Sequence, residues 1–200
     1  MGKMLRGVLC VVLPLVIIGC GGGTKVARVS TDTTIDLSGR WNDTDSRLVA
    51  QEMIKDALSQ RWLYRWEAQG RTPTIIVGRV VNRSHEHISV ETFTKDIERA
   101  LLNSGSVKFV ASSNERQQIR EERYEQEMYA SEETMKEHGD EIGADFMLIG
   151  SINTIVDREG KRSVIFYQVN MELVDVRTNA KVWMGEKKIK KYVERSAARV

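Results

Sequence analysis

The clearest pattern of apolar and polar positions lies toward the C-terminal end of the chain, where it predicts three successive strands. The first begins with residues 146–149, which are apolar at every position, so we expect it in the middle of a sheet, covered on both faces. The second alternates apolar and polar side chains, and alternate side chains of a strand point to opposite faces. Its core-facing positions are predicted to be Ile165, Tyr167, Val169, Met171 and Leu173.

Two short segments of turn-forming residues, 157–160 and 177–180, separate this strand from the first one and from a third over residues 181–193. Connections this short are typical of a β-meander, in which consecutive strands pair antiparallel. The meander is therefore predicted to form the sheet onto which the upstream helices pack.

Helical periodicity occurs in three places before the meander. From residue 44 to residue 66, apolar side chains recur every three or four positions, and Asn42 or the next residue can cap the start. A second amphipathic helix is predicted over residues 89–104, with Gly105 as its C-terminal stop. A third, very polar helix is predicted from residue 115 to about residue 138.

Two further strands are predicted, a β-branched run at residues 74–81 near the sheet centre and a short run at 108–111. The predicted fold class is α/β, with a mixed sheet that ends in a three-strand meander and is flanked by amphipathic helices. No composition shift after residue 35 indicates a second domain, so residues 35–200 are predicted to form a single domain.

Composition and charge narrow the class of protein. Of the 200 residues, 41% are hydrophobic and 29% charged, which indicates a globular chain and not a disordered one. The formal net charge of +2 is too small for a strongly polybasic protein, so we expect no nucleic-acid partner.

The first 19 residues have the layout of an export signal. Lys3 and Arg6 supply positive charge, an apolar segment follows, and the sequence Ile-Ile-Gly precedes Cys20. This end resembles the lipobox of bacterial lipoproteins, in which lipid is attached to the cysteine and the signal is removed before it. A lipidated Cys20 anchors an exported domain to a membrane, and Gly21 after it favours the outer membrane. The alternatives are a plain signal peptide and a membrane anchor in which the cysteines occur by chance.

Residues 20–34 are predicted to form a short flexible tether, because three glycines and a polar run follow the cysteine. The span from Cys20 to Asp36 contains no proline, and fully extended it reaches roughly 55 Å.

Charge is distributed unevenly within the predicted domain. Residues 114–145 hold eleven acids against four bases, whereas residues 177–200 hold eight bases against two acids. One interpretation is a solvated helix together with an edge strand that lysines protect from edge-to-edge pairing. The other is that these patches steer a partner protein, with Lys188 and Lys190 as candidate contacts.

Trp41 is a second candidate for partner binding, together with Arg40 and Arg47, because exposed Trp and Arg are enriched in binding hot spots. The alternative is a packed tryptophan beside solvated arginines.

Motifs of catalysis and cofactor binding are absent from the sequence. It contains no Gly-x-Ser-x-Gly elbow, no His-Glu-x-x-His and no dinucleotide fingerprint. His85 and His87 share a strand parity but lack the third ligand that a zinc site needs, so a polar loop is favoured. We therefore expect no enzymatic activity, cofactor, metal or small-molecule substrate.

Three stretches together resemble the LpoB-type activators of penicillin-binding proteins. They are residues 35–47, residues 143–151, and residues 173–178 followed by Val182 and Trp183. The second and third stretches are also similar to TolB N-terminal and CsgG-like domains, and the first is the more discriminating. The resemblance covers about residues 20–193.

The resemblance implies a mixed sheet flanked by helices and a lipoprotein of the Gram-negative outer membrane. It also implies a partner, a class A penicillin-binding protein, which such a protein stimulates without being an enzyme itself. The alternative function is a structural lipoprotein that oligomerises, as CsgG-like secretion pores do. A pore needs additional membrane-spanning hairpins, and the chain from residue 35 onward shows no spare hairpins of that kind.

Overall fold

The computed structural model describes residues 24–131, 133–134 and 139–195 of a chain that divides into two units, Met1–Thr33 and Thr34–Val200. In the first unit the described residues are all exposed, and the Thr33 N–H donates to the Ser30 carbonyl at 3.0 Å. Cys20, predicted to carry the lipid, lies outside the described residues. The remaining description concerns the second unit.

The second unit begins with two helices, after which strands and helices alternate until the final meander. In the described part the elements are α1 (Asp43–Leu58), α2 (Arg61–Glu67), β1 (Thr74–Arg83), α3 (Val90–Ser104), β2 (Lys108–Phe109), α4 (Ser113–Tyr129), β3 (Phe146–Glu159), β4 (Arg162–Asp175) and β5 (Lys181–Glu194).

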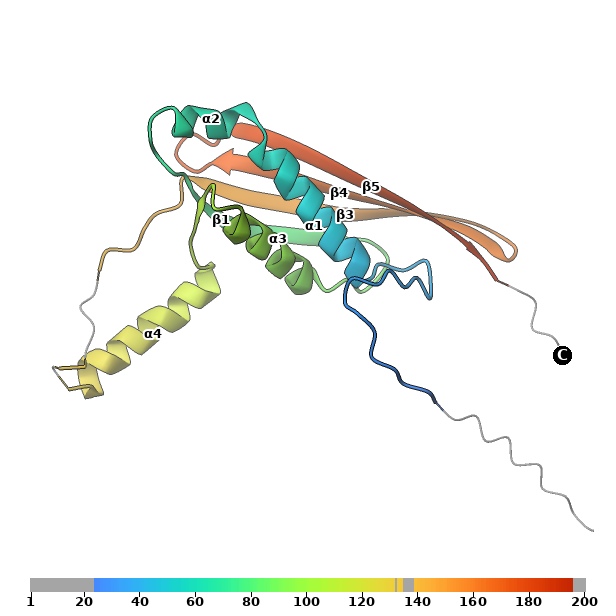
Figure 1. Cartoon of the computed structure of the whole chain (residues 1–200), viewed down its shortest axis with the longest axis horizontal. Coiled ribbons are helices and arrows are strands. Elements are labelled where there is room, and N and C mark those ends of the chain that lie inside the picture. Colours follow the sequence, from blue (N-terminus) through green and yellow to red (C-terminus); the bar gives the residue numbers. More distant parts are fainter. Residues whose placement is uncertain (1–23, 132, 135–138, 196–200) are drawn as a thin grey trace, which may run out of the picture. The chain divides into compact units, whose positions relative to one another are not determined.

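The strands form one mixed sheet in the order β2-β1-β3-β4-β5 (Figure 1). β1 pairs parallel with both β2 and β3, while β3, β4 and β5 form the predicted antiparallel meander. The mixed α/β fold class is thus confirmed, and β3 is the central strand as expected.

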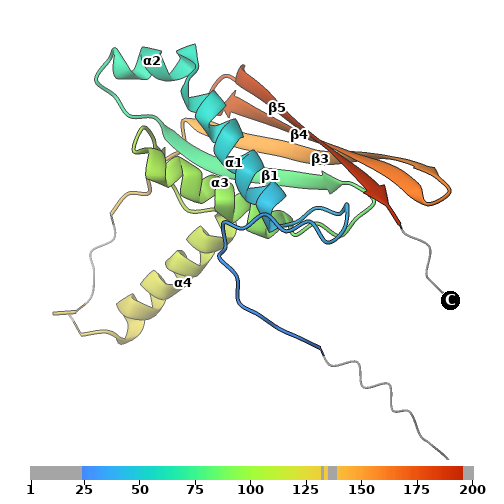
Figure 2. The same ribbon diagram turned by 45° about the vertical axis from the view of Figure 1, so that its right-hand side comes forward.

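The prediction that β3 is covered on both faces is wrong. α1 and α3 lie side by side against the same face of the sheet (Figures 1 and 2). Leu148 of β3 points to that face and is 1% exposed, whereas its neighbour Met147 points to the other face and is 38% exposed. No described element packs over the second face. The all-apolar run therefore indicates the central position of β3 in the sheet but not burial of both its faces.

The core lies between the sheet and the two helices. The predicted alternation of β4 is confirmed, since Ile165, Tyr167, Val169, Met171 and Leu173 are all buried. α1 adds Val49, Met53 and Ala57, and α3 adds Phe93, Ile97 and Leu101 to the same cluster.

The single helix predicted over residues 44–66 is wrong, because the chain forms α1 and α2 with a break between them. The Ser59 hydroxyl donates to the Asp56 carbonyl at 2.7 Å, so it competes with the main chain for the last turn of α1. Because of the break, the Trp62 side chain contacts the last turn of α1. Its indole N–H donates to the Ala57 carbonyl at 2.8 Å, and its ring centroid lies 5.1 Å from that of Phe146.

The polar helix predicted to reach about residue 138 is shorter than expected. α4 begins with the capping box of Ser112 and Glu115, but it ends at Tyr129, and Ala130 is already extended. None of its residues is buried, so no tertiary packing prolongs the helix beyond its local caps. β2 is also shorter than predicted, and the β3–β4 turn is shifted to Gly160–Lys161.

Candidate functional site

The segment before α1, residues 36–42, is held to β5 by a partly buried network of ion pairs and hydrogen bonds. Lys191 donates from Nζ to Asp45 Oδ2 at 2.6 Å, to Asp36 Oδ1 at 2.9 Å and to the Arg40 carbonyl at 3.2 Å. The side chains of Lys191 and Asp45 are only 12% and 9% exposed. Burial by itself would lower the pKa of Lys191, but the two carboxylates outweigh it and raise that pKa. The lysine therefore stays charged and holds the segment in place.

Asp45 serves this network and the helix start together. Its Oδ2 accepts from the Asn42 N–H at 3.0 Å, while the Asp45 N–H donates to Asn42 Oδ1 at 3.0 Å, which completes a capping box. The Asn42 amide also donates to Asp36 Oδ1 at 2.7 Å. The hydrogen bond from Lys191, joined by that from Asn42, lowers the pKa of Asp36. The helix cap and the ion network are thus one structure.

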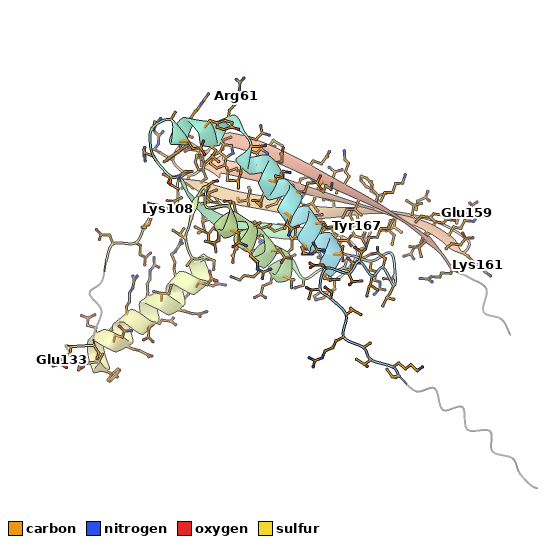
Figure 3. The ribbon with its side chains drawn as sticks, in the orientation of Figure 1. Arg61, Lys108, Glu133, Glu159, Lys161 and Tyr167 are labelled. Atoms are coloured by element: carbon orange, nitrogen blue, oxygen red, sulfur yellow. The ribbon has the colours of Figure 1, made fainter. Side chains whose placement is uncertain are left out.

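A second set of contacts fastens the same segment to β4. The Tyr167 hydroxyl lies 2.8 Å from Glu86 Oε1 and 3.0 Å from the Gly39 carbonyl, and the Trp41 N–H donates to Glu86 Oε2 at 3.1 Å. Burial, with the Glu86 carboxylate adding to it, raises the pKa of Tyr167, so the phenol stays neutral and can donate. Figure 3 labels Tyr167 beside the start of α1.

Trp41, predicted as a partner contact, packs into the fold. Its ring is edge-on to Tyr167 at a centroid distance of 5.5 Å and to Phe93 at 6.0 Å, so it bridges β4 and α3. Its side chain is half-buried, while its neighbour Arg40 is exposed and Arg47 is half-buried. The indole therefore contributes to the core contacts of the segment.

Lys188 and Lys190 lie on the opposite face of the sheet from Lys191. They pair across β4 with Gln168 and Phe166, and both are exposed. Lys188 forms an ion pair with Glu186 at 2.6 Å. Lys190 nevertheless lines a pocket together with residues 36–39, so it lies beside the Arg40 segment, whereas Lys188 does not line that pocket.

The residues that fasten the segment were not among the predicted site residues. Lys191 is hidden in a run of lysines, yet it has the same strand parity as Trp183, which is buried. A charged side chain at a core-facing position was the available signal, because such a group needs a partner. Glu86 carries no comparable signal, since it lies in the loop after β1.

In the described ranges, no three His, Cys, Asp or Glu side chains are grouped so that they could hold a metal ion. His85 and His87 are exposed in the loop after β1. Among the helices of that same part, none combines the length and the apolar character needed to cross a bilayer.

The family model described as peptidoglycan-synthase activator LpoB matches residues 45–189. This match runs from the first turn of α1 into β5 and covers more than half of the chain. The protein belongs to the LpoB family of peptidoglycan-synthase activators. No curated protein matches the chain.

Several solved structures match this chain at low sequence identity and with TM-scores below 0.5. The C-terminal domain of LpoB from Escherichia coli is 18% identical with a TM-score of 0.46, over 74% of this chain and 99% of that one. The corresponding domain from Salmonella enterica is 17% identical with a TM-score of 0.44 over the same shares. Lipoprotein GNA1162 from Neisseria meningitidis is 17% identical with a TM-score of 0.40, over 63% of this chain and 88% of that one.

Proposed function

We propose that this protein is an outer-membrane lipoprotein, anchored through Cys20, that binds and stimulates a class A penicillin-binding protein. In this proposal residues 1–19 are the removed signal, residues 20–34 the tether, and residues 35–200 the activating domain. The observation that carries the proposal is the match of the family model over residues 45–189, which coincides with the folded elements from α1 to β5. The protein supplies no catalytic residue to the synthase.

Activation requires that the domain bind the active conformation of the synthase more tightly than the idle one. A ligand with equal affinity for both conformations shifts no equilibrium, however tightly it binds. Lys191 and Tyr167 support such a role, because they hold the segment before α1 in one position against the sheet.

The contact surface needs both charge and an apolar anchor. Arg40, Arg47, Lys188 and Lys190 are the proposed charged contacts, and exposed charges of this kind mainly change the association rate. Trp41 was the expected anchor, but its ring is engaged with Phe93 and Tyr167. We therefore assign Trp41 to holding the segment, and the anchor has to lie elsewhere.

Equilibrium binding to purified synthases tests the proposal. The full chain in detergent is titrated against each class A penicillin-binding protein of the host, at two salt concentrations. We expect saturable binding to at least one of them, weakened by salt because charged side chains line the contact. Replacing Lys188 and Lys190 by glutamate should lower the affinity at low salt and leave the affinity at high salt nearly unchanged. The salt dependence of the binding then becomes smaller. An absence of binding to every such synthase would discard the proposal.

A further inference from the structure

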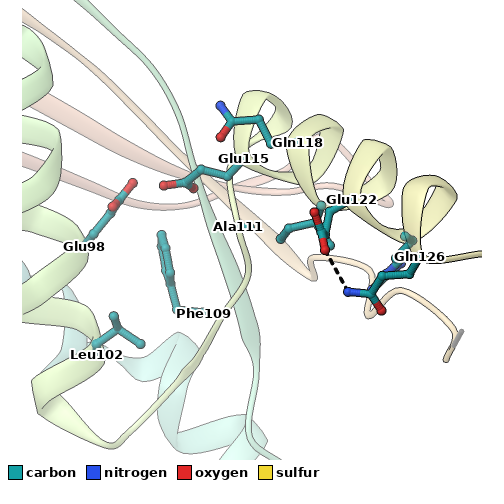
Figure 4. A pocket seen from close by; sticks show the side chains of 10 residues that line it. Glu98, Leu102, Phe109, Ala111, Glu115, Gln118, Glu122 and Gln126 are labelled. Atoms are coloured by element: carbon teal, nitrogen blue, oxygen red, sulfur yellow. Dashed lines mark hydrogen bonds between the residues drawn. The ribbon is translucent and has the colours of Figure 1, made fainter. Parts of the chain in front are cut away.

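A groove opens where α4 leaves the sheet. It has a volume of about 750 Å³ and lies between α3, the end of β2 and α4 (Figure 4). Leu102 of α3 and Ile119 of α4 line it and are 56% and 45% exposed, and Phe109 of β2 lies between them, half-buried. Apolar side chains on three elements thus face a common open space.

The width of the groove depends on a few polar ties. Lys95 of α3 donates to Glu115 of α4 at 2.7 Å, and Arg120 of α4 donates to Glu141 at 2.7 Å. Because no residue of α4 is buried, the helix is positioned by these ties and by its junction with β2. An occupant that contacts Ile119 can therefore add the packing that α4 lacks.

The main chain at the same place offers a sheet edge with which no described strand pairs. β2 is the last strand of the sheet on this side. The Lys108 N–H donates to the Pro73 carbonyl at 2.8 Å, and the N–H of Val110, just after β2, donates to the Ile75 carbonyl at 3.2 Å. Alternate N–H groups of a strand point in opposite directions, so those of Phe109 and Ala111 point away from β1. Both residues also line the groove, so the edge and the groove adjoin.

The charges around the groove are mostly acidic. The described residues that line it include three glutamates, Glu98, Glu115 and Glu122, and a single cation, Arg123. Glu98 and Glu115 are paired with Lys95, whereas Glu122 accepts only from the Gln126 amide, at 2.8 Å, among the described residues. The groove therefore complements a segment that carries a lysine or arginine beside apolar side chains.

We propose that this groove is the anchor site for the partner, and that it takes an extended segment of the synthase that adds to the open edge of β2. This inference rests on the proposed function. Main-chain hydrogen bonds from Phe109 and Ala111 hold such a segment, while alternate side chains enter the groove against Leu102 and Ile119. A basic side chain of the segment pairs with Glu122.

Binding of the full chain to the purified class A penicillin-binding proteins tests the anchor, with variants at exposed positions. Leu102→Arg and Ile119→Arg should each weaken the binding about tenfold or more, as the loss of an interface anchor does. The matched control is Leu48→Arg on α1, which is 47% exposed and lies outside the groove. Its affinity should stay within about twofold of the parent chain, since substitutions outside the contact are nearly neutral.

Two charge-reversal variants on α4 test whether an effect on binding belongs to the groove or to any exposed position of the helix. Glu122→Lys should weaken the binding strongly, whereas Glu125→Lys makes the same charge change at an exposed position that does not line the groove and should have little effect. Ala111→Pro removes one N–H of the open edge and should also weaken the binding. Melting curves of each variant establish that it folds.

The outcomes distinguish the two proposals. If the parent chain binds no synthase, the proposed function fails and the anchor site fails with it. If the parent binds and the groove variants bind as their controls do, the groove is overturned while the function stands. Binding that survives Ala111→Pro overturns the strand addition. Groove variants that dissociate an oligomer of this chain in light scattering show a second copy as the occupant, which also overturns the proposal.

Discussion

Lys190 and Lys191 are adjacent in β5, but their side chains point to opposite faces of the sheet and perform different tasks. Lys190 is exposed, whereas Lys191 is held by Asp45 and Asp36 with 12% of its side chain exposed. Removing one member of a buried ion pair leaves the other charge without compensation, which costs about 3 kcal/mol or more. Neighbouring residues of one type thus differ greatly in their contribution to stability.

Lys191→Met should therefore lower the free energy of unfolding by about 3 kcal/mol, because Asp45 is left buried and unpaired. Lys190→Met, the matched control, should change it by less than about 0.5 kcal/mol. Urea denaturation of both variants measures the difference. Since the pKa of Lys191 is raised, its contribution is fully present below the ordinary value of 10.5 and is lost only as the pH rises through the higher value of the folded protein. Equal effects of the two substitutions would contradict this account.

Trp41→Ala should destabilise the domain by about 2 kcal/mol or more, because the ring packs edge-on against Phe93 and Tyr167. Differential scanning calorimetry of the variant measures the loss. A melting temperature unchanged from the parent would show that the indole is a free surface group, as one interpretation of the sequence held.

The core-facing positions of the strands could be predicted from the sequence more accurately than the ends of the helices. The apolar alternation of β4 is fixed by its period of two, and every predicted core position there is buried. The break between α1 and α2 could not be predicted, because one polar side chain, Ser59, redirects the last turn inside a continuous apolar stripe. The end of α4 could not be predicted either, because charge composition carries no signal for the absence of packing.

α4 is held by ion pairs between exposed side chains. Because protonation of their carboxylates breaks these pairs, the attachment of α4 is sensitive to acid. The hydrogen bond from Lys95, with further ones from Ser112, lowers the pKa of Glu115 to about 2. A lowered carboxyl pKa means that the stabilisation is present above the ordinary value of 4.5 and is lost as the pH falls through about 2. Both side chains of the Lys95–Glu115 pair are more than 40% exposed, so we expect the pair to be worth less than about 1 kcal/mol.

An NMR titration of the Glu115 carboxyl should therefore show a midpoint well below 4.5 in the parent protein. In Lys95→Met the midpoint should move back toward the ordinary value, because the largest cause of the shift is removed. The global melting temperature at pH 7 should hardly change. A midpoint near 4.5 in the parent would mean that α3 and α4 are not tied in solution.

At the scale of the whole molecule, the two ends of the proposed mechanism are the lipid on Cys20 and the groove beside α4. The stretch from Cys20 to Asp36, which contains the predicted tether, spans at most roughly 55 Å when extended. The Lys191 network fixes where the chain enters the domain, at the start of α1. The sequence could predict the family, which the family model confirms, whereas the lipid on Cys20 stays a prediction. The groove could not be predicted, because Leu102 and Ile119 come from separate helices with no shared pattern.

Metabolic labelling with palmitate should mark the parent chain and leave Cys20→Ala unlabelled, because a lipobox has only one acceptor cysteine. The labelled protein should fractionate with the outer membrane. Equal labelling of the parent and of Cys20→Ala would contradict the proposed lipid anchor on Cys20.

The rate of glycan polymerisation by a purified class A penicillin-binding protein, measured with and without the full chain, tests the central claim most directly. We expect the rate to rise in a saturable way with the concentration of the chain, and to rise as far with Leu48→Arg. With Leu102→Arg the rise should require a much higher concentration. Binding without any increase in rate, for every class A synthase of the host, would contradict the claim that this protein is an activator.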